Sequence, residues 1–138
     1  GGLRPQLAAG LAGFALLAGV ALGLGIAAGG DDDERTVTAS VDRTRLPGGS
    51  ARVEIDDGTA VLRVRGAPQP PPGKVYEVWV ERDGEVRPAG ALFGVDRDGD
   101  GSAAIPGGVE DVDRVMVTRE VAQGVEVPTE QPVIQAKV

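Results

Sequence analysis

The sequence contains no cysteine and no histidine among its 138 residues. Zinc and blue-copper sites depend on imidazole or thiolate ligands, so both kinds of metal centre are excluded. Ser-His-Asp and Cys-His nucleophile systems are excluded because the base or the nucleophile is missing. No disulfide can form, so the fold has to be stabilised by a packed core. Since no other residues are found that could act together as base and nucleophile, we expect a protein that is not an enzyme and has no cofactor.

Charged residues are almost absent from positions 1–30, where Arg4 is the only one. All 21 acidic residues lie further along the chain, which has a net charge of −7. An acidic domain repels the phosphate backbone of nucleic acids, so nucleic-acid binding is not expected. The basic residues are scattered singly through the predicted strands, a pattern typical of a solvated face.

The longest uncharged segment runs from Pro5 to Gly30, and within it Leu7–Ala28 spans 22 residues. At about 1.5 Å per residue, a helix of this length crosses a hydrocarbon core of about 30 Å. The apolar part of a signal peptide is shorter, at about 7–15 residues. The sequence therefore predicts a transmembrane anchor over residues 1–30 with its core at 7–28. The run "GIAAGG" leaves a cleaved signal peptide as the alternative.

The charges on either side of this segment predict its orientation. Arg4 precedes it, and the acidic run "DDDE" at 31–34 follows it. Positive residues stay on the cytoplasmic side of a membrane. We therefore expect a single-pass protein of the cell membrane with a cytoplasmic N-terminus, a charged tether over residues 31–35 and an extracytoplasmic domain over residues 36–138.

Two glycines of the segment, Gly19 and Gly23, have the small-xxx-small spacing that can mediate helix–helix association. A segment so rich in Gly and Ala also gives this spacing by composition alone, and we favour that interpretation. Because Gly lowers helix stability, such a span is expected to unwind more readily than a Leu-rich one.

After residue 35, apolar and polar residues alternate with a period of two, as they do in half-buried strands. Asp57-Gly58 and Asp83-Gly84 each separate two such runs, which indicates two hairpins. The run "APQPPPGK" at 67–74 predicts a connection between sheets, because consecutive prolines remove backbone donors. The pattern predicts an all-β antiparallel sandwich of about eight strands after a single N-terminal transmembrane α-helix.

The stretch "VYEVWVERDGEVRPAGALF", residues 75–93, contains Tyr76, Trp79 and Phe93, although the whole chain has only one Tyr, one Trp and two Phe. Tyr76 and Val78 alternate onto one face of the first strand and Trp79 onto the other, which indicates a central strand. Each aromatic side chain buries about 150–250 Å², so we expect a Tyr-Trp-Phe cluster to form the core. An aromatic platform for a ligand is the less favoured alternative.

The run "DRDGDGS" places Asp96, Asp98 and Asp100 at the spacing that begins a calcium loop. The bidentate Glu that completes an EF-hand loop would be residue 107, which is Gly107. A hairpin turn, in which Asp and Gly supply capping and positive φ, is therefore the favoured interpretation. Weak calcium binding at this turn is the alternative. No set of residues with catalytic chemistry is found.

The landmarks of the second half resemble the extracytoplasmic C-terminal domain of the anti-sigma-K factor family. The residues that carry the resemblance are Tyr76, Trp79, Asp83, Gly84, Gly90, Thr118, Glu120, Gly124, Pro128 and Thr129. The resemblance covers residues 36–138, and the apolar segment ahead of them is placed where the family has its membrane span. It implies a β-sandwich with these residues in structural positions.

The resemblance further implies an anti-sigma factor that regulates sigma-factor release through gated intramembrane proteolysis. The expected partners are the membrane, a sigma factor bound by a cytoplasmic domain ahead of Gly1, and envelope and intramembrane proteases. The alternative is a membrane-anchored β-sandwich that acts as a binding or adhesion module of the cell envelope, with no sigma factor.

Overall fold

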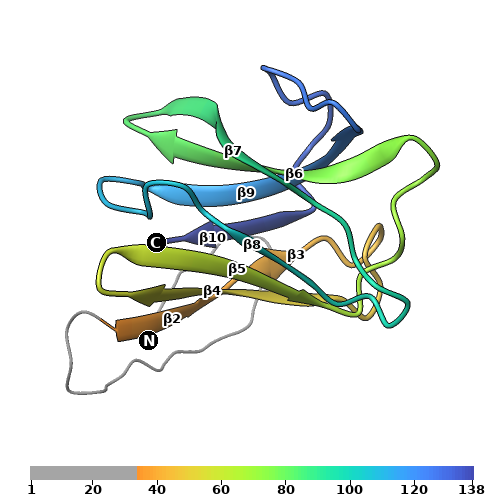
Figure 1. Ribbon diagram of the computed structural model, residues 1–138, viewed down its shortest axis with the longest axis horizontal. Coiled ribbons are helices and arrows are strands. Elements are labelled where there is room, and N and C mark those ends of the chain that lie inside the picture. Colours follow the sequence, from red (N-terminus) through yellow and green to blue (C-terminus); the bar gives the residue numbers. More distant parts are fainter. Residues whose placement is uncertain (1–33) are drawn as a thin grey trace.

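The computed structural model describes residues 34–138, which form nine β-strands in two antiparallel sheets (Figure 1). The five-stranded sheet has the order β3-β10-β9-β6-β7 and the four-stranded sheet the order β2-β4-β5-β8. The strands are β2 (Glu34–Thr38), β3 (Ser40–Val41), β4 (Ser50–Asp56), β5 (Thr59–Arg65), β6 (Lys74–Arg82), β7 (Glu85–Phe93), β8 (Gly101–Ala104), β9 (Arg114–Val121) and β10 (Ile134–Lys137). The prediction of an all-β antiparallel fold is confirmed for these residues.

The predicted anchor lies outside the described residues, and so do its marker residues Leu7, Gly19, Gly23 and Ala28. From Glu34 to Val138, no helix is both long and apolar enough to cross a membrane. The transmembrane helix therefore stays a prediction from the sequence.

The first strand segment is divided between the two sheets. β2 begins at Glu34, inside the predicted tether, and pairs with β4. The last bond to that sheet comes from Ala39, whose N–H donates to the carbonyl of Ala51 on β4 (2.9 Å). The chain leaves the sheet after this residue. β3 follows and pairs with β10 of the other sheet. The alternation that begins after residue 35 is thus divided between two short strands, and this segment joins the two sheets at their edges.

Both predicted hairpins are present. Asp57 and Gly58 connect β4 to β5 with φ values of 46° and 82°. Asp83 and Gly84 connect β6 to β7 with φ values of 52° and 81°. Two successive residues at positive φ match the right-handed twist of the flanking strands, and Asp-Gly tolerates this conformation well. The turn chemistry of the sequence therefore fixes the register of both hairpins.

The proline-rich connection crosses between the sheets, as predicted, since β5 belongs to the four-stranded sheet and β6 to the five-stranded sheet. Two side chains hold it in place. The hydroxyl of Tyr76 donates to the carbonyl of Pro68 (2.7 Å). The amide of Gln69 donates to the carbonyls of Val95 and Asp96 (2.9 and 2.8 Å).

The apolar core lies between the sheets, and the prediction of one Tyr-Trp-Phe cluster within it is wrong. Tyr76 and Phe93 stack there with ring centroids 5.3 Å apart. Trp79 is completely buried but lies outside this cluster. It is three residues from Tyr76 in an extended strand, so its side chain points to the opposite face. That face must be covered by another part of the chain.

β7 contains an irregularity beside Trp79. Val78 pairs with Ala91, but the next residue, Trp79, pairs with Pro88, so extra residues bulge from β7. Gly90, in this bulge, has a φ of 87°. Glycine adopts this conformation without the steric cost that a Cβ imposes, which explains the glycine at this position.

Two adjacent glycines before β9 provide a test of the packing between loops. Gly107 and Gly108 both have positive φ, 78° and 71°. A methyl group at Gly107 would meet open space, whereas at Gly108 it would clash with the carbonyl oxygen of Gly58.

We expect Gly107→Ala to lower the free energy of unfolding by about 1–2 kcal/mol through backbone strain alone. Gly108→Ala is expected to lower the free energy of unfolding by about 1–3 kcal/mol more than Gly107→Ala does, because the β4–β5 turn has to move. Urea unfolding followed by Trp79 fluorescence measures both. Equal losses in the two variants would contradict the close approach of the two loops.

Candidate functional site

The segment between β9 and β10, residues 122–133, folds over the outer face of the five-stranded sheet, and we call it the closing loop. Figure 1 shows it in blue on the side of that sheet that faces away from the four-stranded sheet. On β6, Glu77 and Trp79 point to this outer face, opposite the core residues Tyr76 and Val78. On β9, Thr118 is the register partner of Glu77 and shares its face.

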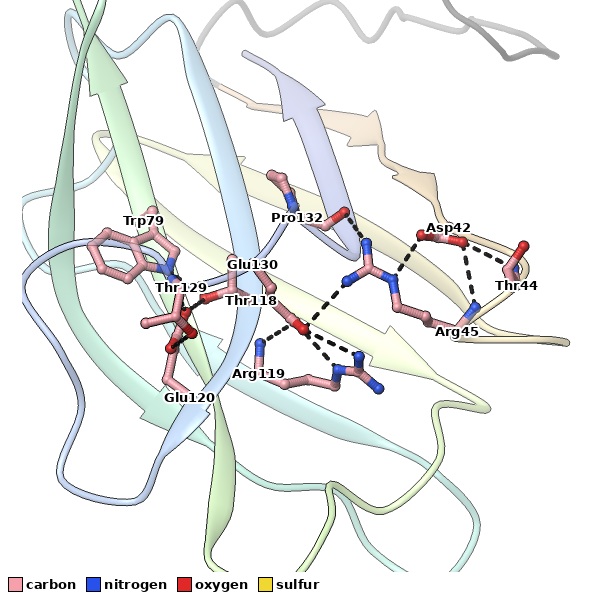
Figure 2. A network of polar contacts seen from close by, with 10 residues as sticks. All are labelled: Asp42, Thr44, Arg45, Trp79, Thr118, Arg119, Glu120, Thr129, Glu130 and Pro132. Carbon is pink, nitrogen blue, oxygen red and sulfur yellow. Dashed lines mark hydrogen bonds and ion pairs between the residues drawn. The ribbon is translucent and has the colours of Figure 1, made fainter.

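A chain of hydrogen bonds runs from the Trp79 indole to the closing loop (Figure 2). The Trp79 Nε1–H donates to the Thr118 hydroxyl (2.8 Å), which in turn donates to Oε2 of Glu120 (2.6 Å). In the closing loop, the Thr129 N–H donates to Oε2 of Glu120 (3.0 Å) and the Thr129 hydroxyl to Oε1 (2.6 Å). We call Trp79, Thr118, Glu120 and Thr129 the Trp-Glu network.

The Glu120 carboxylate is the centre of this network, and its residue is only 1% exposed. Burial by itself raises the pKa of a carboxyl group because it disfavours the charged form. The hydrogen bonds from Thr118 and Thr129 outweigh burial and hold the pKa of Glu120 below its ordinary value. Glu120 is therefore a buried anion at neutral pH, stabilised by donors from β9 and from the closing loop.

Glu77 is a second buried acid beneath the closing loop, with an exposure of 4%. Its Oε1 accepts a hydrogen bond from the Val125 N–H (3.0 Å). Burial raises the pKa of Glu77; the hydrogen bond from Val125 opposes this effect, and the nearby carboxylates of Glu120 and Glu126 add to it. Glu77 and Glu120 thus have pKa values shifted in opposite directions within one site.

The far end of the closing loop is bound to the N-terminal part of the domain (Figure 2). The Glu130 carboxylate accepts hydrogen bonds from the backbone N–H of Arg119 (2.8 Å) and from its guanidinium (3.1 and 3.2 Å). Arg45, which follows β3, forms an ion pair with Glu130 (3.3 Å) and donates to the carbonyl of Pro132 (3.2 Å). Asp42 orients Arg45 through a 2.8 Å ion pair.

Backbone hydrogen bonds complete this attachment. The Asp42 N–H donates to the carbonyl of Val133 (2.9 Å), and the Val133 N–H donates to the carbonyl of Val117 on β9 (2.8 Å). The closing loop is therefore attached at one end to the Trp-Glu network and at the other to the segment that follows β3.

Comparison of the sequence with known proteins assigns the chain to a protein family. The family model described as "Anti-sigma-K factor rskA, C-terminal" matches residues 8–133. The chain belongs to the anti-sigma-K factor family. A Streptomyces griseus protein named "Uncharacterized protein in phr 5'region" is 32% identical to the chain over 96 residues. The match covers 70% of this chain and 40% of the relative, so the chain spans less than half of that protein's length. No solved structure matches the chain.

The structure brings together several of the residues on which the resemblance to the anti-sigma-K factors rests. Trp79, Thr118, Glu120 and Thr129 form the Trp-Glu network, and Pro128 precedes Thr129 in the closing loop. Gly124 lies against Glu77, since a Cβ built on it would be 3.6 Å from both carboxylate oxygens, and its φ of 82° favours glycine at this position.

The other family positions have separate structural roles. Tyr76 lies in the core, Asp83 and Gly84 form the β6–β7 turn, and Gly90 lies in the bulge of β7. Sequence reasoning missed Glu77. The available signal was its position in the period-two pattern. Glu77 lies two residues before Trp79 and therefore shares its face, as a charged residue within the otherwise apolar middle of the strand.

The turn that contains Asp96, Asp98 and Asp100 is held together by hydrogen bonds between its backbone and the Asp96 side chain. Oδ1 of Asp96 accepts hydrogen bonds from the N–H groups of Asp98 (2.8 Å) and Asp100 (3.0 Å). This is the side-chain capping expected of a turn aspartate. Within residues 34–138, no group of three or more acidic side chains is arranged to hold a metal ion.

The opposite pKa shifts predict opposite pH effects of two isosteric substitutions. The pKa of Glu120 is lower in the folded state, so its contribution is present above the unfolded value and is lost as the pH falls through the folded pKa. The pKa of Glu77 is higher in the folded state, so its favourable contribution is lost as the pH rises through the folded pKa.

Glu120→Gln is expected to lower the free energy of unfolding by about 1–3 kcal/mol at neutral pH, with the loss fading at acid pH. Glu77→Gln, which is neutral at every pH, is expected to gain stability relative to wild type as the pH rises. Urea unfolding from about pH 3 to pH 8 measures both. The control is Glu85→Gln, whose side chain is 70% exposed. Parallel pH profiles for the Glu77 and Glu120 variants would contradict the assignment.

Proposed function

We propose that the chain is the membrane-attached, extracytoplasmic part of an anti-sigma factor, and that its β-sandwich controls proteolytic release of a sigma factor. The observation that carries the proposal is the continuous family match from residue 8, inside the apolar segment, to residue 133, at the end of the closing loop. The apolar segment and the β-sandwich are thus matched together by one family model. In this proposal a cytoplasmic domain upstream of Gly1 holds the sigma factor.

The element that controls access for the first protease is β2, which directly follows the acidic residues 31–33. Every residue of β2 pairs with β4, from Glu34 with Asp56 to Thr38 with Arg52. Proteases cleave chain segments that open locally, so a paired strand resists cleavage. Only one of its five residues is even partly buried, so little apolar packing opposes its release.

The closing loop affects β2 through β3 in this scheme. β3 pairs with β10, and the residues after β3 are bonded to the closing loop through Asp42–Val133 and Arg45–Glu130. A signal that displaces the closing loop removes these contacts from the segment next to β2. The sandwich then acts by holding or releasing its first strand, with no catalytic residue of its own.

The absence of cysteine gives a direct test of the proposed topology, since one introduced thiol is unique in this chain. We expect Glu85→Cys, at a 70% exposed side chain, to react with a membrane-impermeant maleimide in intact cells. Gly2→Cys, on the other side of the apolar segment, is the control and is expected to react only after lysis. The reverse pattern would contradict the extracytoplasmic assignment.

A second test concerns the control of cleavage. Arg45→Met in the full-length protein, tagged at both ends, removes the contacts to Glu130 and Pro132. If the lost contacts are worth about 1 kcal/mol, the open population rises about fivefold, and so does the cleaved fragment on immunoblots. Sigma-dependent transcription is expected to rise with it. The control is Arg43→Met at the neighbouring exposed arginine. Equal cleavage in the two variants would contradict control by the closing loop.

A further inference from the structure

The outer face of the four-stranded sheet carries a row of polar side chains that crosses all four strands. At one register level Thr38 pairs with Arg52, Arg52 with Arg63, and Arg63 with Ser102. Paired residues share a face, and this face is the one opposite the core residues Val53 and Leu62. Adjacent strands lie about 4.8 Å apart, so the row is a line of hydroxyl, guanidinium, guanidinium and hydroxyl groups about 14 Å long.

A third arginine lies beside the row, at the next register level along β5. Arg65 is two residues from Arg63 on β5, faces the same way and pairs with Ser50. It forms no ion pair within residues 34–138. The sequence interpretation of singly scattered basic residues is therefore wrong for Arg52, Arg63 and Arg65, because strand pairing gathers them. We call these three residues the arginine face.

One carboxylate positions two of these side chains. Nε of Arg52 lies 2.8 Å from Oε2 of Glu54, and Nε of Arg63 lies 2.7 Å from Oε1 of the same residue. Each guanidinium is held through Nε, and the two side chains remain 38% and 45% exposed. Glu54 therefore fixes the direction of two guanidinium groups and leaves their terminal NH₂ groups available.

Around the row, the local charge differs from that of the whole chain, which has a net charge of −7. Three guanidinium groups lie there with one carboxylate, that of Glu54, whereas Asp56 and Glu34 lie on the same face about 13 Å along the strands from the row. Like charges directly opposite on neighbouring strands, as in Arg52 and Arg63, are destabilising. At physiological ionic strength the Debye length is about 8 Å, so an anion on this face is largely screened from more distant acids.

We propose that the arginine face binds a linear phosphate-bearing polymer laid across the four strands. Guanidinium groups donate two parallel hydrogen bonds to a phosphate, and two fixed guanidiniums can hold one phosphate or two neighbouring ones. The hydroxyls of Thr38 and Ser102 supply further donors along the row, and the hydroxyl of Ser50 lies beside Arg65 at the next register level of the same face. This surface is separate from the closing loop, so the inference does not depend on the proposed control of proteolysis.

A soluble polymer fits this position better than a membrane surface does. Thr38 lies four residues along β2 from Glu34, which places the row about 13 Å from the start of the strand. The predicted anchor precedes Glu34, so the row lies away from the anchored end of the sheet. Anionic phospholipid vesicles are consequently the comparison that the experiment requires.

The test measures binding of linear inorganic polyphosphate to the 138-residue chain in a neutral detergent by isothermal titration calorimetry. We expect saturable binding that weakens by about tenfold or more when Arg52, Arg63 and Arg65 are all replaced by Gln. The control replaces three exposed arginines elsewhere, Arg43→Gln, Arg87→Gln and Arg97→Gln, with the same charge change. It is expected to stay within about twofold of wild type.

Equal weakening in the two triple variants would overturn the proposal, since net charge alone would then explain the binding. Polyglutamate bound as tightly as polyphosphate, or phosphatidylglycerol vesicles bound more tightly through the same arginines, would also overturn it. Arg63→Lys with Arg65→Lys keeps the charge and removes the planar fork, and is expected to bind polyphosphate more weakly than wild type. Unchanged affinity in this double variant would contradict recognition by the guanidinium groups.

Discussion

The arrangement of this domain depends on one buried charge, the carboxylate of Glu120. A buried anion is costly unless donors surround it, and three donors from Thr118 and Thr129 meet its two oxygens. Because Thr129 belongs to the closing loop, this solvation requires the loop to lie against the sheet. The same contacts leave the Thr118 hydroxyl able to accept from the Trp79 indole, which would otherwise be a buried donor without a partner.

This constraint connects parts of the domain that are distant in sequence. The closing loop covers the outer face of β6 and β9, and its far end is bonded to the segment after β3 through Arg45 and Asp42. That segment continues back into β2, the strand nearest the predicted membrane anchor. A change at the closing loop therefore has a contiguous physical route to the first strand, which is the basis of the proposed control of proteolysis in this anti-sigma-K family member.

Local features such as the hairpin turns could be predicted from the sequence, whereas the segment that covers the outer face of the five-stranded sheet could not. Tight hairpin turns require positive φ, which Asp-Gly pairs adopt readily, so both hairpins could be predicted from the residues themselves. Period-two alternation placed Trp79 opposite Tyr76, but it carries no information on what covers the outer face, so the predicted aromatic cluster was wrong. The resemblance supplied Thr118, Glu120 and Thr129 as positions without their contacts. The alternation of apolar and polar residues also continues through Ala39, so it did not predict that the chain changes sheets there. The pairing of Arg52 with Arg63 depends on strand register, which the sequence pattern does not give.

Hydrogen exchange of individual backbone amides tests the central claim most directly, because the Thr129 and Val125 N–H groups donate to buried carboxylates. If Glu120 and Glu77 hold the closing loop on the sheet, these two amides exchange slowly, at rates comparable with those of the neighbouring β9 amides. Exchange of both at the rate of an unstructured chain, while β9 stays protected, would contradict the account.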